Sequence, residues 1–345
     1  MKKVMALLVS LLGGILAASA DDPQPLMVQR GACLLDESFS SALDTSKWQV
    51  GIGAWTVESG ALSGVERPAD HHPAVMKTSF KPICGIAQIS FLAKGDAKLQ
   101  IAFNDAGGHN SRVQVSTNSL VMFKNADRKD PRSYTPILDE TGAVLAPDTW
   151  HTMTLELCGE EMLARVDGKF FVCGSHPGIN QEKTDLLLVV SGSAQFDNVK
   201  LWSATPNSSW PAEKAKLLAS AAGRPAVDRS GNPQEAYMAA EVKVRDRLMK
   251  SDEKFKSLVD VRGTAMEALA KAFPVVNRKG PKADAEKKRL ASEDANFKQL
   301  TKTVQVAQKA ERDYLVAQAP EVKKLWEALV AANRAKASPP AAAKK

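Results

Sequence analysis

A change of hydrophobic period near Trp202 constrains the fold of this chain more than any other feature. From Leu34 to Ser203 apolar and polar residues alternate with a period of two between turn residues, and beyond Trp202 apolar residues recur every three or four positions. The first pattern is typical of strands with one buried face, and the second is typical of amphipathic helices. The sequence therefore predicts an all-β antiparallel sandwich over 34–205, followed by an α-helical C-terminal region.

A polar strip lies on one face of the predicted sandwich and consists of Lys98, Gln100, Arg112, Gln114 and Ser116. About thirteen short strands follow one another without helices between them, which indicates two packed sheets whose outer faces stay polar. The strip could line a groove for a glycan, or it could be an ordinary solvated face. Both interpretations fit the pattern.

The C-terminal part divides into a linker (206–233), a helical region (234–335) and a tail (336–345) that we expect to be disordered. The linker is rich in glycine and proline and carries one short predicted helix at 210–222. Pro274 and Gly280-Pro281 interrupt the helical pattern, which favours a short antiparallel coiled-coil hairpin over one long zipper. Glu311 falls on a predicted core position of this hairpin.

Residues 1–20 are predicted to form a secretory signal peptide. Two lysines precede an apolar run over 4–17, and Ala18-Ser19-Ala20 is a typical cleavage site. The run is too short for a membrane span, which needs roughly 20 residues, and no later segment is apolar enough to cross a bilayer. We therefore expect residues 21–33 to lead into a sandwich that is exported to the periplasm or the extracellular space.

Export would place the four cysteines, Cys33, Cys84, Cys158 and Cys173, in an oxidising compartment. The turns after Cys158 and before Cys173 would put these two residues on strands that flank a third, about 9–10 Å apart at two strand spacings. A disulfide requires Cα atoms within roughly 7 Å. Pairing with Cys33 or Cys84 is therefore at least as compatible with the pattern, and free buried thiols are the remaining alternative.

Charge is distributed unevenly along the chain. Within a formal net charge of +7, residues 1–20 contribute +2, residues 21–206 contribute −6 and residues 207–345 contribute +11. The basic side chains of the last segment are interspersed with acidic ones and form no aromatic-interleaved motif, so we expect no nucleic-acid partner. An anionic cell-envelope polymer, the chain's own acidic sandwich or self-association through the helical region fits this charge better.

All five histidines lie in the predicted sandwich, and two of them are adjacent. Asp70, His71 and His72 stand in a proline-bounded loop, and loops on a rigid sheet are where functional residues concentrate. We take these three as the candidate catalytic group, acting as a general base or as part of a metal site. Glu66 and Arg67 in the same loop are candidate ligand-binding residues. The alternative is a structural loop in which one histidine packs and the other is solvated.

A second candidate site follows the strand that ends near Phe103. Asn104, Asp105, His109 and Arg112 are candidate ligand-binding residues there. Asparagine and aspartate oxygens could bind Ca²⁺, the one candidate cofactor, or could hydrogen-bond sugar hydroxyls. The same residue types are also the ordinary residues of a hairpin turn, and we favour that interpretation.

Three stretches resemble the concanavalin A-like, or laminin-G-like, sandwich superfamily. They are LLDESFSSALDTSKWQV with AWTVESGALSG in 34–64, WHTMTLELCGEEMLARVDGKFF at 150–171 and FDNVKLW at 196–202. Within that superfamily they are similar to the 3-keto-disaccharide hydrolase domains of secreted bacterial proteins. The resemblance implies a concanavalin-like jelly roll in an exported, carbohydrate-active protein that binds or hydrolyses a glycan or disaccharide.

Catalysis itself has no motif in this sequence. Retaining β-sandwich glycosidases place two carboxylates in a Glu-x-Asp-x-Glu pattern, which is absent here, as are common metal, nucleophile-elbow and phosphate-loop motifs. Two function classes therefore stand side by side: a glycoside hydrolase-like enzyme, and a non-catalytic glycan-binding, adhesion or cell-envelope structural module.

Overall fold

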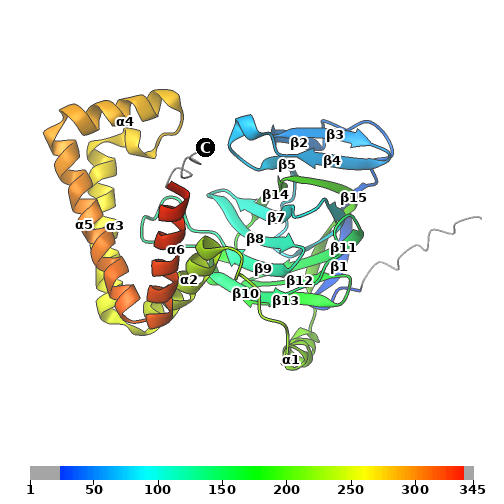
Figure 1. Cartoon of the computed structure of the whole chain (residues 1–345). Helices are drawn as coiled ribbons and strands as arrows, with labels where there is room; N and C mark the ends of the chain where they lie inside the picture. The colour runs from blue at the N-terminus through cyan, green and yellow to red at the C-terminus, as the bar shows by residue number, and fades with distance from the viewer. Residues whose placement is uncertain (1–23, 338–345) are drawn as a thin grey trace, which may run out of the picture.

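The computed structural model describes residues 24–337, which form a β-sandwich joined to a group of helices (Figure 1). The predicted signal peptide, the start of the lead-in and most of the predicted tail lie outside the described residues.

One sheet of the sandwich has eight strands. They are β1 (Val28–Glu37), β3 (Ala54–Glu58), β4 (Ala61–Val65), β6 (Gly85–Ala93), β11 (Trp150–Cys158), β12 (Glu161–Val166), β13 (Phe170–Ser175) and β15 (Ser193–Pro206). Their order is β13-β12-β11-β6-β15-β4-β3, with β1 also paired to β15.

The other sheet has seven strands. They are β2 (Trp48–Ile52), β5 (Ala74–Ser79), β7 (Lys98–Asp105), β8 (Gly108–Ser116), β9 (Ser119–Lys124), β10 (Ile137–Gly142) and β14 (Lys183–Ser191), in the order β10-β9-β8-β7-β14-β5-β2. The inward side chains of both sheets, such as Leu99 and Phe103 on β7 and Leu155 on β11, form one buried core. This confirms the predicted antiparallel sandwich.

The sandwich begins earlier than the sequence analysis expected. β1 starts at Val28, inside the predicted lead-in, because it pairs with β15 as far as Pro206. A fully buried carboxylate, Glu156 on β11, holds the preceding residues by accepting hydrogen bonds from the backbone N–H groups of Leu26 (2.9 Å) and Met27 (2.6 Å). An ion pair with Arg165 (3.0 Å) balances its charge.

Cys84 and Cys158 form a disulfide. β6 and β11 pair with Leu157 opposite Gly85, so the next two residues outward along this register are the cysteines themselves. Cys173 lies on β13, with β12 between it and β11, as the turn pattern predicted. It is a buried free thiol, and Cys33 is an exposed one.

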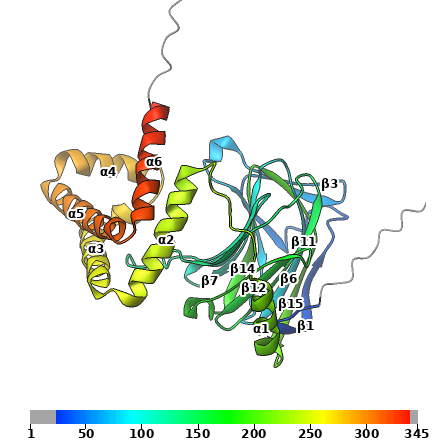
Figure 2. The same cartoon turned by 60° about the horizontal axis from the view of Figure 1, so that its bottom comes forward.

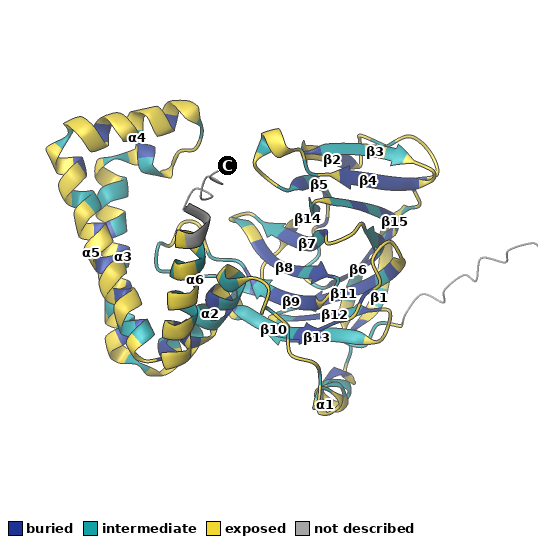
Figure 3. Ribbon diagram, in the orientation of Figure 1, coloured by how far each residue is buried: buried dark blue, intermediate teal, exposed yellow. Residues whose placement is uncertain are grey.

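The helices are α1 (Trp210–Ser220), α2 (Pro233–Ser251), α3 (Glu253–Ala272), α4 (Pro281–Glu293), α5 (Ala295–Ala317) and α6 (Pro320–Ala337). α3 and α5 run side by side in opposite directions, with α4 across one end, and α2 packs against α6 (Figures 1 and 2). α6 continues into the predicted tail. The outer surfaces of α4 and α5 are largely exposed (Figure 3). None of the described helices is both long and apolar enough to cross a membrane.

Glu311 on α5, which interrupts the predicted apolar stripe, is 2% exposed. Its carboxylate forms ion pairs with Arg245 on α2 and with Arg262 on α3, the latter at 2.5 Å. Arg262 also donates a hydrogen bond to the backbone carbonyl of Pro131 in the sandwich (2.5 Å). The interruption of the stripe is therefore a buried charged junction of three helices.

The loop over 125–136, between β9 and β10, connects the helices to the sandwich through ion pairs. Its Arg132 forms ion pairs with Asp260 (3.1 Å) and Glu267 (2.5 Å) on α3. Gly263 lies beneath this arginine, and a Cβ atom at that position would come within 2.5 Å of the Arg132 Cγ atom. Glycine at this position therefore lets Arg132 lie directly on α3.

The acidic sandwich and the basic C-terminal segment also pair directly. Asp139 on β10 binds Arg224 (2.9 Å), and Glu140 binds both Arg229 and Lys243 (2.5 Å each). The chain's own sandwich thus serves as one of the acidic partners that the charge pattern indicated.

Candidate functional site

Two hollows lie where the seven-stranded sheet meets the helices, and both are partly lined by the loop over 125–136. We call the first the sheet groove. Its volume is about 500 Å³, and it is lined by Lys98, Gln100, Arg112, Gln114, Val121, Phe123, Thr135, Ile137, Ser191, Arg229, Asn232, Gln234, Glu235, Met238, Ala239 and Val242. The second, the loop cleft, has a volume of about 980 Å³.

The sheet wall of the groove is the polar strip expected from the alternation of β7 and β8. These strands pair with Gln100 opposite Gln114, so alternate residues project from the same outer face. Lys98, Gln100, Arg112 and Gln114 line the groove. Ser116 does not, because it is buried and its hydroxyl hydrogen-bonds within the turn that follows β8.

The opposite wall comes from Asn232, in the predicted linker, and from the start of α2, which begins at Pro233, one residue before the predicted helical region. Asn232 caps this helix by accepting a hydrogen bond from the backbone N–H of Glu235 (3.2 Å). Glu235 in turn forms an ion pair with Lys98 across the groove (2.9 Å). The signal was present in Asn232-Pro233-Gln234-Glu235, since an N-cap residue, a proline and an acid in the first turn mark a helix start.

Arg112 presents a positive charge to the groove without a counter-ion. Its guanidinium lies 4.4 Å from the centre of the Phe123 ring. The buried Nε atom has no hydrogen-bond partner, and no carboxylate among the described residues pairs with this side chain. Burial lowers the pKa of Arg112 to about 10, so the group stays protonated at neutral pH.

Three amide side chains in the groove, those of Gln100, Gln114 and Gln234, are not engaged with the protein. In the part of the chain that the structure describes, none of them hydrogen-bonds to another side chain or to the backbone. Their donors and acceptors are therefore available to a ligand.

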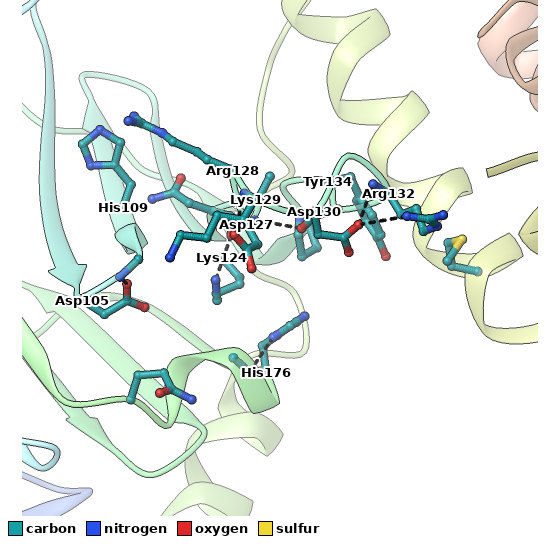
Figure 4. Close-up of a pocket in the computed structure, with 18 of the residues that line it drawn as sticks. Asp105, His109, Lys124, Asp127, Arg128, Lys129, Asp130, Arg132, Tyr134 and His176 are labelled. Carbon is teal, nitrogen blue, oxygen red and sulfur yellow. Dashed lines mark hydrogen bonds and ion pairs between the residues drawn. The ribbon is translucent and has the colours of Figure 1, made fainter. Parts of the chain in front are cut away.

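The loop cleft opens between the turn after β7, the loop over 125–136 and α3 (Figure 4). Asp105 accepts hydrogen bonds from the backbone N–H of Gly107 and from the Asn110 amide, both at 2.7 Å, and Asn104 bonds to His109 (2.9 Å). Turn and side-chain partners thus occupy these oxygens. The described residues contain no cluster of three or more His, Cys, Asp or Glu that could hold a metal ion. The Ca²⁺ hypothesis therefore rests on the sequence alone.

His109 and His176 line this cleft, and both have lowered pKa values. The pKa of His109 is lowered first by burial and then by the charges of Arg128, Arg112, His72 and Lys279.

For His176, on the far side of the cleft, burial is again the main cause of the lowered pKa, followed by the charge of Lys124. Both imidazoles are therefore neutral and able to accept a proton at neutral pH.

The two lowered pKa values predict how stability changes with acidity. A depressed pKa means that the unfolded chain binds the proton more readily, so stability is present above the ordinary histidine pKa of about 6.5 and is lost as the pH falls. Replacing both residues, His109→Gln with His176→Gln, should flatten this part of the profile. Urea unfolding from about pH 7.5 to pH 5 would measure the change. An unaltered slope in the double variant would contradict the prediction.

The loop that holds the candidate catalytic group lines neither hollow. Asp70 accepts hydrogen bonds from Arg67 Nε (2.9 Å) and from the backbone N–H of Gly53 (3.1 Å), so its carboxylate ties the loop to the sheet. His71 has a left-handed backbone (φ +48°), and both it and His72 are exposed.

The remaining residues predicted for these sites do not converge on a single site. Glu66 accepts a hydrogen bond from the backbone N–H of Gly192 (3.0 Å), beside β15. From the histidine loop, the charge of His72 contributes to the lowered pKa of His109. The structure thus brings Asn104, Asp105 and His109 together beside the loop cleft and places Arg112 in the sheet groove.

No protein-family model matches the chain, and no curated protein does. Solved structures similar to its sandwich include the carbohydrate-binding module CBM66 from Bacillus subtilis, at 14% identity over 46% of this chain and 96% of the module, with a TM-score of 0.38. A Bacillus subtilis protein of unknown function with a galectin-like fold is 13% identical over 52% of this chain and all of that one (TM-score 0.42). SCLam, a non-specific endo-β-1,3(4)-glucanase of family GH16, is 14% identical over 51% of this chain and 95% of the enzyme (TM-score 0.39). The likeness is one of fold.

Proposed function

We propose that this is an exported glycan-binding protein whose sheet groove holds the sugar. The supporting observation is that the amides of Gln100, Gln114 and Gln234 face the groove without a protein partner. An amide both donates and accepts hydrogen bonds, as sugar hydroxyls do. The groove volume falls within the ~300–1,000 Å³ that small-molecule sites usually occupy. The resemblance of the sandwich motifs to carbohydrate-active proteins supports the same class of ligand.

The groove favours binding over hydrolysis. Glycoside hydrolysis ordinarily uses two carboxyl groups that flank the scissile bond. Glu235 is the one carboxylate among the described residues that line the groove, and it is already paired with Lys98. Hydrolysis, including that of a 3-keto disaccharide, is the second candidate function. It is supported by the neutral imidazoles of His109 and His176 in the loop cleft, which could act as general bases.

Export is part of the same proposal. It is supported by the signal peptide predicted over 1–20 and by the disulfide between Cys84 and Cys158, because stable disulfides are typical of oxidising compartments.

Removing two of the amides tests the proposed binding site. A glycan array with the full-length protein should identify a ligand, and Gln100→Ala combined with Gln114→Ala should weaken its binding roughly 10-fold or more, at about 1 kcal/mol per lost hydrogen bond. Titration calorimetry measures this loss. Gln49→Ala, an exposed glutamine on β2 of the same sheet, is the matched control and should bind like the wild type.

Three results would count against binding in the groove. They are an array without any bound glycan, an unchanged affinity in the double glutamine variant, and release of sugar from oxidised or ordinary disaccharides. Sugar release that is lost on replacing His109 and His176 by alanine would favour the hydrolase instead.

A further inference from the structure

Arg112 supplies a charge that recognition of a neutral sugar does not require. We infer that the sheet groove selects an acidic glycan, one whose sugar units carry a carboxylate or a sulfate ester, and that Arg112 binds this anionic group. The inference rests on the proposed function and names the class of sugar that the same groove would take.

The first argument is the missing counter-ion. Withdrawing a guanidinium from water is costly unless the charge is paired. Arg229, which lines the same groove, meets this requirement by binding Glu140 at 2.5 Å. Arg112 has no carboxylate partner among the described residues, although burial affects it strongly enough to lower its pKa. An anionic ligand would supply the missing charge.

The second argument is the charge balance of the groove. Its described lining contains three cations, Lys98, Arg112 and Arg229, and one anion, Glu235. Lys98 is paired with Glu235 inside the groove, and Arg229 is paired with Glu140. Arg112 is therefore the one cation of the described lining that has no carboxylate partner, and its charge can take one negative group on the ligand.

The third argument is the way the guanidinium is held. The guanidinium carbon lies over the Phe123 ring, a cation–π contact that uses none of its N–H donors. A guanidinium is planar and can offer two parallel hydrogen bonds to a carboxylate or sulfate, and such charge-assisted hydrogen bonds are about twice as strong as neutral ones. The amides of Gln100 and Gln114 on the same face can then bind the hydroxyls of the sugar ring.

The test compares matched ligands on the full-length protein. The probes are a uronic-acid oligosaccharide, the same oligosaccharide with its carboxyl groups reduced to alcohols, and a sulfated form of the reduced one. We expect the wild type to bind the two acidic forms roughly 10-fold more tightly than the neutral form, as one charge-assisted hydrogen bond allows. The better of the two acidic probes identifies the anionic group.

Variants of Arg112 link this preference to one side chain. Arg112→Gln should bind the acidic and neutral forms equally. Arg112→Lys should keep a weaker preference, because an ammonium is a point charge without the planar donor pair. Lys77→Gln removes one positive charge from β5 of the same sheet without touching the groove, and it should keep the full preference.

Each outcome bears on one of the two proposals. Equal affinity of the wild type for acidic and neutral forms, or an unchanged preference in Arg112→Gln, would overturn the acidic-glycan inference and leave glycan binding intact. Failure to bind any of the three probes or any glycan on the array would overturn glycan binding itself. Should Arg112→Gln fail to fold, the wild-type comparison of the acidic and carboxyl-reduced ligands still decides the question.

Discussion

Replacing Glu311 by alanine is expected to lower the free energy of unfolding by about 3–5 kcal/mol, since it would leave buried charge uncompensated. Glu311 is 2% exposed, and the side chains of its partners Arg245 and Arg262 are each 14% exposed. Arg245 keeps a second carboxylate, that of Glu241 (3.1 Å), so the loss should fall most heavily on Arg262. Urea unfolding followed by far-ultraviolet circular dichroism would measure the change.

Asp313 on the same helix provides the matched control. Its ion pair with Lys309 is exposed on the surface of α5, and surface pairs contribute about 0–1 kcal/mol. Asp313→Ala should therefore be nearly neutral. If Glu311→Ala were as stable as Asp313→Ala, the junction would contribute nothing beyond an ordinary surface ion pair.

Removing the disulfide should have an effect of similar size. Cys84 and Cys158 are 74 residues apart, and closing a loop of that length in the unfolded chain stabilises the folded state by about 4.5 kcal/mol in the chain-entropy model. The double variant Cys84→Ala with Cys158→Ala should lose about this much in denaturant unfolding under oxidising conditions.

Two comparisons separate loss of the cross-link from loss of the side chains. The wild type in the presence of a reductant should approach the stability of the double variant. Cys33→Ala, which replaces the exposed free thiol, should behave like the wild type. A wild type that is insensitive to reductant would contradict the prediction.

The sandwich was predictable because its signal is local. Alternation in a strand such as β11 requires only neighbouring residues, and its apolar members Met153, Leu155 and Leu157 are all buried as expected. The cysteine pairing was not predictable, because it depends on which distant strand lies beside β11. That choice is made by the packing of the whole sheet, and the sequence pattern around Cys84 and Cys158 does not contain it.

Glu311 shows a second limit of pattern reasoning. In an apolar stripe read from the sequence, a charged residue at a core position looks like an interruption of the core. The two arginines that compensate it lie on other helices, at 245 and 262, and only the packing of α2 and α3 against α5 brings them together.

The candidate site was predictable to a similar extent. Strand parity located Lys98, Gln100, Arg112 and Gln114 on one face, because side chains alternate strictly along a strand. The helix of the opposite wall was predicted from residue 234 onward, but its place in the groove was not, because a helical pattern does not show which sheet face the helix packs against.

The histidine loop shows what sequence adjacency leaves open. His71 and His72 are adjacent in sequence beside Asp70, yet the carboxylate hydrogen-bonds to Arg67 and to the backbone of Gly53. Adjacency in sequence does not establish that side chains converge. A catalytic role for this loop stays a prediction from the sequence.

Because the walls of the sheet groove come from two distant parts of the chain, a ligand in it would act as a bridge between sandwich and helices. By mass action, a sugar that binds only when the two walls are together would stabilise the attached arrangement by about 2.7 kcal/mol at a free concentration of 100 times its dissociation constant. A fragment ending at Pro206 would keep both sheets and the disulfide, but it would lose Gln234 and Glu235 and expose the apolar side chains of Val121 and Phe123 to water. Ligand binding and attachment of the helices are therefore linked, and a substitution that loosens the helices should also weaken ligand binding.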